Sequence, residues 1–189
     1  RAGDALSLYR PSVQGYAAAV RQADWAVTAG DRTAAAAAAW RAFEVGATSE
    51  DRLYALALLV EAYRTVDDLA GAERDLAGRP RGPEVDQTRL DVLLELGRYD
   101  EAVAFVQASG DAALRERLLG VLRAAGRTDE VKAEYARLIR AQPAEARWSN
   151  DLAALHLQQG DVDGAVAVYK LFFAANRDRA EAQIEAARR

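Results

Sequence analysis

The sequence contains no cysteine, no methionine, one histidine and only four prolines in 189 residues. The absence of cysteine excludes disulfides, thiolate metal ligands and a cysteine nucleophile. His156 is the single imidazole, so a Ser-His-Asp triad has no other histidine to use. From these absences we expect no enzymatic activity, no cofactor and no metal.

Long apolar runs and strand patterns are missing as well. The apolar run Leu53–Val60 is bounded by Arg52 and Glu61, well short of the roughly 20 residues that a membrane span needs. No run of alternating β-branched residues predicts a strand. The net charge of −4 argues against nucleic acid as the main partner. The chain begins at Arg1, which we interpret as the start of a processed or excised piece.

A short phrase recurs along the chain: Gly, two variable residues, Asp or Thr, one variable residue, then Ala or Val. Copies begin at Gly30, Gly97, Gly126 and Gly160, and a weaker copy begins at Thr65 without the glycine. Gly126 and Gly160 are 34 residues apart. A fixed period of this size indicates stacked supersecondary units.

Each copy of the phrase has the chemistry of a helix-turn-helix joint. Glycine supplies the left-handed residue that ends a helix. Asp or Thr three residues later is predicted to cap the next helix; these residues are Thr33, Asp68, Asp100, Asp129 and Asp163. The small residue two positions further on permits close approach of the paired helices; these residues are Ala35, Ala70, Ala102, Val131 and Ala165.

The joints divide the chain into units. Residues 1–15 are predicted to be the end of a preceding repeat or a cap, with a helix over 2–10 that Pro11 stops. The units are then 16–50 and 51–82, followed by 83–111, 112–145 and 146–179, with a further helix beginning at 180–189. Helices are expected near 16–29, 33–45, 51–64 and 68–77. One continuous solenoid therefore comprises 16–82 and 83–189, and the Gly- and Pro-rich segment 78–83 predicts a bend between them.

This pattern resembles the tetratricopeptide repeat (TPR) family over essentially the whole chain. The matching features are the period of 34, the turn glycines, the small residue early in the second helix, the later aromatics Tyr135 and Tyr169, and the closing Pro143. The resemblance implies an all-α fold, an α-α superhelix (a TPR-like solenoid) of about five helix-turn-helix units. First helices of such units line a concave groove, and stability comes from contacts between neighbouring units.

The resemblance also implies where a partner would bind. Family members contact ligands through fixed places on the first helices, which here hold Gln87, Asp91, Glu95, Glu116, Arg123, Arg147, Asn150 and Gln158. The set is polar and mixed in sign. The Lys/Asn clamp with which chaperone-binding members hold a C-terminal carboxylate is absent, which disfavours that function. Recognition of an extended or helical segment remains open.

Other residues have structural interpretations. His156 lies between two leucines and is interpreted as a packed, hydrogen-bonded core histidine, although a catalytic base is the alternative. Asp161 and Asp163 resemble the start of a calcium loop, but the later ligands of an EF-hand do not follow. Aromatic residues are expected mostly in the core, against the alternative of a ligand cage; they are Trp25, Trp40, Trp148, Phe172 and Phe173.

Two functions from different classes follow. The first is a non-catalytic bacterial TPR scaffold segment that mediates protein–protein interaction through its concave groove, with a protein or peptide partner. The alternative is a structural or assembly spacer in a bacterial envelope or exopolysaccharide-export complex, with self-association. The expected location is the bacterial periplasm or cell envelope, with the cytoplasm left open.

Overall fold

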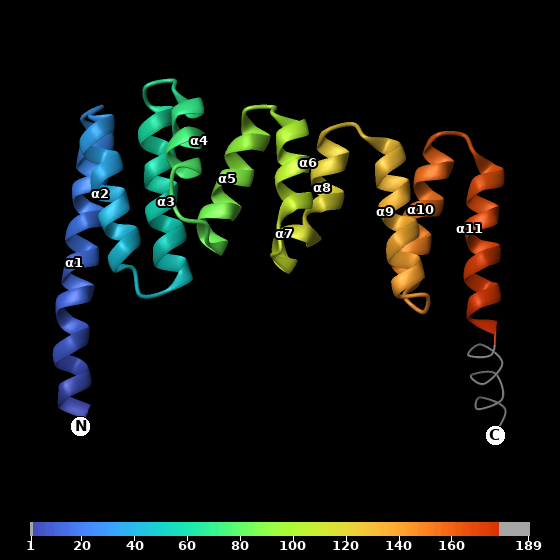
Figure 1. Ribbon diagram of the computed structural model, residues 1–189, viewed down its shortest axis with the longest axis horizontal. Helices are drawn as coiled ribbons and strands as arrows, with labels where there is room; N and C mark the ends of the chain where they lie inside the picture. Colours follow the sequence, from blue (N-terminus) through green and yellow to red (C-terminus); the bar gives the residue numbers. More distant parts are fainter. Residues whose placement is uncertain (1, 178–189) are drawn as a thin grey trace. The chain divides into compact units, whose positions relative to one another are not determined.

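The computed structural model describes the backbone of residues 2–177 and the side chains of residues 15–177. These residues form helices and no strand (Figure 1). The helices are α1 (Ala2–Thr28), α2 (Arg32–Val45), α3 (Ser49–Arg64), α4 (Leu69–Ala77), α5 (Pro83–Glu95), α6 (Tyr99–Ala108), α7 (Ala112–Glu116), α8 (Leu118–Ala124), α9 (Thr128–Ala141), α10 (Ala146–Gln158) and α11 (Val162–Ala175). Over the described residues, no helix is long and apolar enough to cross a membrane.

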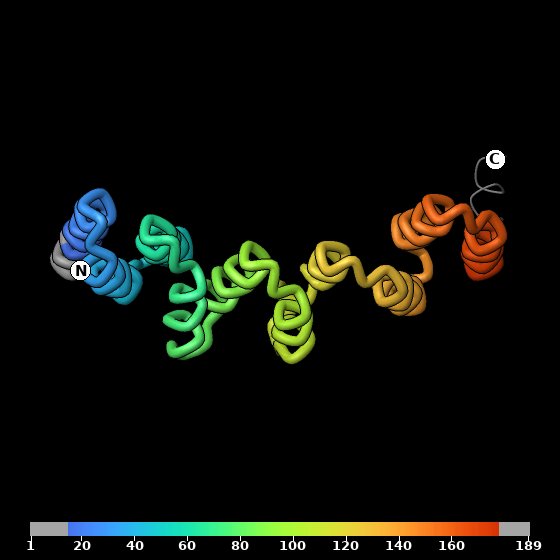
Figure 2. Tube along the Cα trace, turned by 90° about the horizontal axis from the view of Figure 1, so that it is seen from above, coloured from blue at the N-terminus to red at the C-terminus, as the bar shows by residue number. Residues whose placement is uncertain are grey.

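The chain divides into two compact units, Arg1–Val121 and Leu122–Arg189. In the first unit, α1 and α2 form an antiparallel pair, and α3 packs against both helices of that pair (Figure 2). Likewise, α5 contacts both α3 and α4. In the second unit, α10 packs against α9 and α11. In the first unit, the first helices α3 and α5 are therefore each laid against both helices of the preceding pair, as the repeat predicts, and in the second unit α10 is laid against α9.

The four predicted turn glycines confirm the joints between paired helices. Gly30, Gly97, Gly126 and Gly160 have φ angles of 72°, 68°, 68° and 75°, in the left-handed region. The chain reverses at each of them because glycine enters this region without a Cβ penalty. In every case the residue directly after the glycine is the N-cap of the following helix.

The weak joint lies two residues later than predicted. Asp67, with φ 56°, is the left-handed residue between α3 and α4, and Asp68 follows it as the N-cap. Thr65 remains right-handed, with φ −61° and ψ −20°. The prediction placed the joint at Thr65 because Thr65 occupies the glycine position of the repeated phrase. The structure uses Asp67 instead, since Asp also tolerates the left-handed region by bonding to nearby backbone.

The predicted capping residues are wrong at four joints. Asp31 and Asp161 cap α2 and α11, accepting from the N–H groups of Ala34 and Gly164 at 3.0 and 2.8 Å. Arg98 and Arg127 occupy the N-cap positions of α6 and α9 with no side-chain cap bond. Thr33, Asp100, Asp129 and Asp163 thus lie inside the first turns instead, where the helix dipole still favours the three acidic ones. Only Asp68 is both predicted and observed as a cap.

The predicted small residue is buried at the contact between paired helices. Counted four residues from each N-cap, these positions are Ala35, Ala72, Ala102, Val131 and Ala165, and each is at most 3 % exposed. Four of them match the prediction. The fifth is Ala72 rather than Ala70, because the joint before α4 is shifted by two residues.

The core of the first unit joins alanines of α2 to large side chains of α3. Trp40 packs with Leu56 and Leu59 in one cluster of buried residues, with Phe43 and Tyr63 partly buried against it. The short alanines let α1, α2 and α3 approach closely. This burial is the main stabilising contribution within the unit.

Two predicted ends of the repeat have different outcomes. Helix α1 continues through Pro11, so the predicted stop there is wrong. A proline removes one backbone hydrogen bond, and the helical turns on both sides keep theirs. The predicted helix at 180–189 lies outside the described residues. The division into 1–15, 16–82 and 83–189, and the bend at 78–83, stay predictions.

Candidate functional site

Three predicted contact residues share one face of α5. Gln87, Asp91 and Glu95 follow one another at intervals of four residues, and all three are exposed. This spacing places them above one another on one side of a helix. The buried residues of the same helix, Val92 and Leu93 among them, turn toward the unit's interior.

The neighbouring helix α3 extends this face with residues that the sequence did not single out. Arg64 of α3 donates to both carboxylate oxygens of Glu95, at 2.9 and 3.1 Å, and also to Glu61. These hydrogen bonds, first to Glu95 and then to Glu61, raise the pKa of Arg64 above its ordinary value. Tyr54, 49 % exposed, lies on the same helix. We call Tyr54, Glu61, Arg64, Gln87, Asp91 and Glu95 the first-helix face.

A simple signal would have found these α3 residues. Glu61 precedes Glu95 by 34 residues, the period of the repeat. No contact residue was predicted in this unit, whose joint lacks the turn glycine and lies two residues later than the repeated phrase predicts. Subtracting the 34-residue period from the predicted contact positions on α5 therefore locates the equivalent face of α3.

Asp91 also pairs with the chain that follows α7. The guanidinium of Arg117, the C-cap of α7, donates to the carboxylate of Asp91. Glu116, another predicted contact residue, is exposed at the end of the same short helix. Both partners of the Asp91–Arg117 pair are at least one-third exposed, so the pair adds little stability and leaves its charges accessible.

The remaining predicted residues lie in the second unit. Arg123 is on α8, and Arg147, Asn150 and Gln158 are on α10; all four are exposed. Arg123 donates to the hydroxyl of Tyr135, and the Arg147 guanidinium lies 3.8 Å from the ring centre of Trp148. The eight predicted residues are therefore exposed, and they divide between the two units. Their joint action as one groove stays a prediction.

His156 has a structural partner. Its Nδ1 lies 2.7 Å from Oδ2 of Asp161, and its side chain is 17 % exposed. The other oxygen of Asp161 accepts from the N–H of Gly164. These two hydrogen bonds, the backbone one first, lower the pKa of the Asp161 carboxyl. The predicted hydrogen bond of the histidine is confirmed, but the side chain is half-buried at the joint rather than enclosed in the core.

Among residues 15–177, whose side chains are described, no group of three His, Asp or Glu side chains is arranged to bind a metal ion. Trp40 is in the core, at 6 % exposure. Trp25 and Phe173 are 71 % and 66 % exposed, so the expectation of core positions is wrong for both. Apolar periodicity alone does not show whether a helix covers a given face.

These helix pairs, with a left-handed residue and an N-cap at every joint, decide the class of fold. The chain has a TPR-like fold. No family model and no curated protein matches it. A crystal structure of MamA protein is similar over 89 % of this chain and 95 % of that one, with 16 % identity and a TM-score of 0.44.

Two further solved structures are similar over most of their length. The structure described as MamA AMB-1 P212121 has 20 % identity and a TM-score of 0.43, over 94 % of this chain and 96 % of that one. A tetratricopeptide repeat protein from Parabacteroides merdae ATCC 43184 has 15 % identity and a TM-score of 0.33, over 93 % and 89 %.

Proposed function

We propose that this chain is a non-catalytic TPR-type scaffold segment that holds a protein or peptide partner against its first-helix face. The observation that carries the proposal is the run of Gln87, Asp91 and Glu95 on α5, continued by Arg64 on α3. These side chains stand on rigid helices and offer carboxylates, an amide and a guanidinium to a segment laid across them. Recognition of this kind requires shape and hydrogen bonding and no chemical step.

The charges of this face are positioned without being buried. The side chains of Arg64 and Glu95 are each nearly half exposed. Asp91 is about half exposed, and its partner Arg117 is about one-third exposed. Ion pairs of this exposure contribute little to folding, so their replacement should change binding more than stability. The face can therefore be tested separately from the fold.

The test is quantitative capture of partners by the chain and two matched variants. Asp91→Ala combined with Glu95→Ala removes two acids from the first-helix face. Asp129→Ala combined with Glu130→Ala removes two acids from the second helix α9. Partners that depend on the proposed face should fall at least tenfold with the first variant and remain with the second. Equal retention by both variants, or equal loss, would show that this face is not the binding site.

A second role is favoured by a different observation. Large apolar side chains are exposed along α11, including Val162 at 59 % and Phe173 at 66 %. Exposed apolar patches on a rigid helix are characteristic of surfaces that assemble. We therefore keep, as the alternative, an assembly spacer that associates with itself, for example within a bacterial envelope or exopolysaccharide-export complex.

A further inference from the structure

The first helix that precedes α9 is interrupted. It consists of two short helices, α7 and α8, that meet at Arg117. The N–H of Arg117 donates to the carbonyl of Leu114, three residues earlier, at 3.0 Å. The regular spacing resumes where the N–H of Val121 donates to the carbonyl of Arg117, also at 3.0 Å. A short stretch of 3₁₀-type bonding inside a helix often marks a functional hinge or a segment under strain.

The sequence of this segment favours one continuous helix. Leu114 and Val121 are buried, and Leu118 is partly buried. Their spacing of four and three residues keeps them on one side of a helix that runs through the break. Residues 112–124 include no proline, and arginine is a good helix former. Local preference therefore does not explain an interruption at Arg117.

The side chain at the break is held by the first-helix face. The Arg117 guanidinium donates to the carboxylate of Asp91 on α5. The backbone of Arg117, with φ −78° and ψ −11°, differs from a regular helix mainly in ψ, by about 30°. The broken and the continuous helix are thus separated by a small rotation. An exposed ion pair contributes little energy, so it can decide only between forms that are close in free energy.

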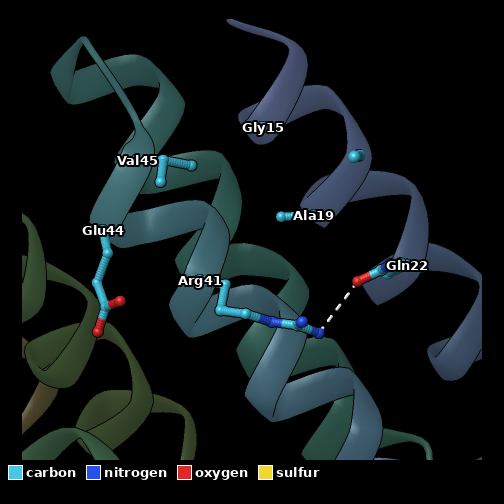
Figure 3. A pocket seen from close by; sticks show the side chains of 7 residues that line it. Gly15, Ala19, Gln22, Arg41, Glu44 and Val45 are labelled. Carbon is cyan, nitrogen blue, oxygen red and sulfur yellow. Dashed lines mark hydrogen bonds between the residues drawn. The ribbon is translucent and has the colours of Figure 1, made fainter. Parts of the chain in front are cut away.

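A guanidinium contact between helices does not by itself interrupt a helix. Arg41 of α2 donates to Gln22 of α1 at 3.0 Å, beside the hollow that these helices line (Figure 3). Both helices continue through that contact. At Arg117, by contrast, the residue that makes the contact is also the residue at which the helix changes its hydrogen bonding.

Closing the break would satisfy backbone groups that the broken helix leaves open. Leu118, Leu119 and Gly120 are the first three residues of α8, and the first N–H groups of a helix have no acceptor within it. In a continuous helix they would donate to the carbonyls of residues 114–116. Gly120 opposes this closure, because glycine is unfavourable in a helix interior. A Cβ at this position meets no atom within 4 Å, so alanine fits there.

The first-helix face already holds cations at two places. Glu95 binds the guanidinium of Arg64, as Asp91 binds that of Arg117. Each of these acids of α5 therefore accepts a planar cation from a neighbouring segment, in an exposed position that a partner can reach. The bound guanidinium of Arg117 shows which chemistry Asp91 accepts.

We propose that residues 112–121 form a two-state first helix. It is broken while Arg117 holds Asp91, and it becomes continuous when a lysine or arginine side chain of a bound partner takes the Asp91 carboxylate. The proposal rests on the scaffold role given above and adds its regulation: Arg117 is a resident competitor for the partner's cation. Because the resident pair is exposed and weak, a partner can displace it.

Amide hydrogen exchange, measured by NMR on the chain without a partner, tests the two states. In the wild type, the amides of residues 118–120 should exchange at least about tenfold faster than that of Val121. Asp91→Ala releases Arg117, and Gly120→Ala favours a continuous helix. Each variant should slow the exchange of residues 118–120 by about threefold or more.

Glu101→Ala is the matched control. Glu101 pairs with Arg98 and is 57 % exposed, close to the 54 % of Asp91, so its removal should leave residues 118–120 unchanged. Wild-type protection of these amides equal to that of Val121 would overturn the proposal, because the helix would then be continuous already. Unchanged or faster exchange in Asp91→Ala would also overturn it, since the pair would then only stabilise the local turn.

Folding of each variant is checked by circular dichroism. Arg117→Gln removes the same ion pair from its other side, and it replaces Asp91→Ala if that variant does not fold. The expected result is the same slower exchange of residues 118–120. Unchanged or faster exchange in Arg117→Gln overturns the proposal in the same way.

A basic peptide tests the coupling to the first-helix face. The probe is a short fluorescein-labelled peptide of alternating glycine and arginine, and its counterpart has glutamate in place of arginine. Gly120→Ala should bind the arginine peptide at least about twofold more tightly than the wild type, since a ligand binds better when the state it favours is already populated. Asp91→Ala should bind it more weakly. Equal affinity for wild type and Gly120→Ala, no binding to either, or tighter binding of the glutamate peptide overturns the proposal.

The outcome is separable from that of the scaffold proposal, because hydrogen exchange is measured without a partner. Failure of the scaffold proposal appears as undiminished capture by the Asp91→Ala and Glu95→Ala variant, while exchange at residues 118–120 still responds to Gly120→Ala. Failure of the two-state helix appears as unchanged exchange, while capture by the same variant still falls.

Discussion

The two compact units join their neighbouring helix pairs by different chemistry. In the first unit, polar contacts recur at an offset of 35 residues: Tyr16 to the Asp51 carbonyl at 3.0 Å, Trp40 to Asp75 at 3.2 Å, and Ser49 to Glu84 at 2.6 Å. In the second unit, the buried Tyr135 makes the ring and hydroxyl contacts between α9 and α10, beside one exposed hydrogen bond from Trp148 to Gln142, the C-cap of α9. Contacts are thus distributed in one unit and concentrated in the other, so single substitutions should affect them unequally.

The distributed contacts of the first unit also include a buried charge. The Glu73 carboxylate, 6 % exposed, accepts from Arg89 at 2.9 Å and from Arg98 at 3.0 Å. Glu73 lies on α4, Arg89 on α5 and Arg98 at the start of α6. One carboxylate therefore ties together three helices that belong to two pairs. The cost of burying it is offset only while both guanidinium groups remain in place.

The largest effect is expected for Tyr135→Ala, which removes the concentrated contact of the second unit. Loss of a fully buried aromatic side chain should cost about 4 kcal/mol. Amide hydrogen exchange should rise across α9 and α10 while α2 and α3 keep their protection. Tyr169→Ala, at the equivalent but exposed position, is the control and should change little. If Tyr135→Ala raised amide hydrogen exchange equally in both units, the effect of the Tyr135 contact would not be confined to the second unit.

Glu73→Ala is expected to have the next largest effect, of about 3 kcal/mol, because it leaves a cavity and two guanidinium groups without their buried partner. Urea unfolding followed by circular dichroism measures it. Glu101 provides a matched control, since it also pairs with Arg98 but is mostly exposed. Glu101→Ala should leave the midpoint nearly unchanged. Similar midpoints for the two variants would contradict the role assigned to burial.

Two glycines at the joints should not tolerate alanine. A Cβ on Gly71 would overlap the Asp68 carboxylate and lie 2.8 Å from the Tyr63 ring, and a Cβ on Gly164 would overlap both Asp161 and His156. Displacing the capping carboxylate should cost about 1–2 kcal/mol in each variant. Gly120→Ala is the control: its Cβ meets no atom within 4 Å, so thermal stability should rise slightly. A neutral Gly71→Ala would show that this joint can relax.

The joints also show how far the sequence can predict this fold. The turn glycines located four joints, because glycine is the residue type most often used in left-handed turns. The fifth joint uses Asp67, which sequence alone does not distinguish from a surface acid. Caps were misassigned because Asp is favoured both as an N-cap and in the first turn, and one-residue distinctions depend on backbone geometry.

Exposure of the candidate site residues was predictable, but their neighbours were not. Gln87, Asp91 and Glu95 share a face through helical periodicity alone. Arg64 joins that face because α3 and α5 are adjacent, which is a tertiary contact. The exposure of Trp25 and Phe173 likewise depends on which helices cover them. Local patterns determined which residues could form a face, and packing between helices determined which faces remained open.

The smallest expected effect concerns pH and the cap of α11. Because the pKa of Asp161 is lowered in the folded chain, its carboxylate stabilises the fold above the unfolded pKa, near 4. That contribution should be lost as the pH falls through the lower, folded value. Asp161→Asn keeps an N-cap acceptor but has no charge to titrate, so it should remove this part of the pH dependence.

Thermal melts between pH 7 and pH 2, compared for the two proteins, measure this contribution. The difference in melting temperature between wild type and Asp161→Asn should be constant above about pH 5 and should shrink below it. Asp31→Asn is the matched control, since Asp31 caps α2 in the same way but has no histidine beside its carboxylate. If the difference in melting temperature between wild type and Asp31→Asn shrinks in the same way over the same pH range, the histidine contributes nothing. A larger loss for Asp161 assigns the excess to the His156 hydrogen bond at this joint.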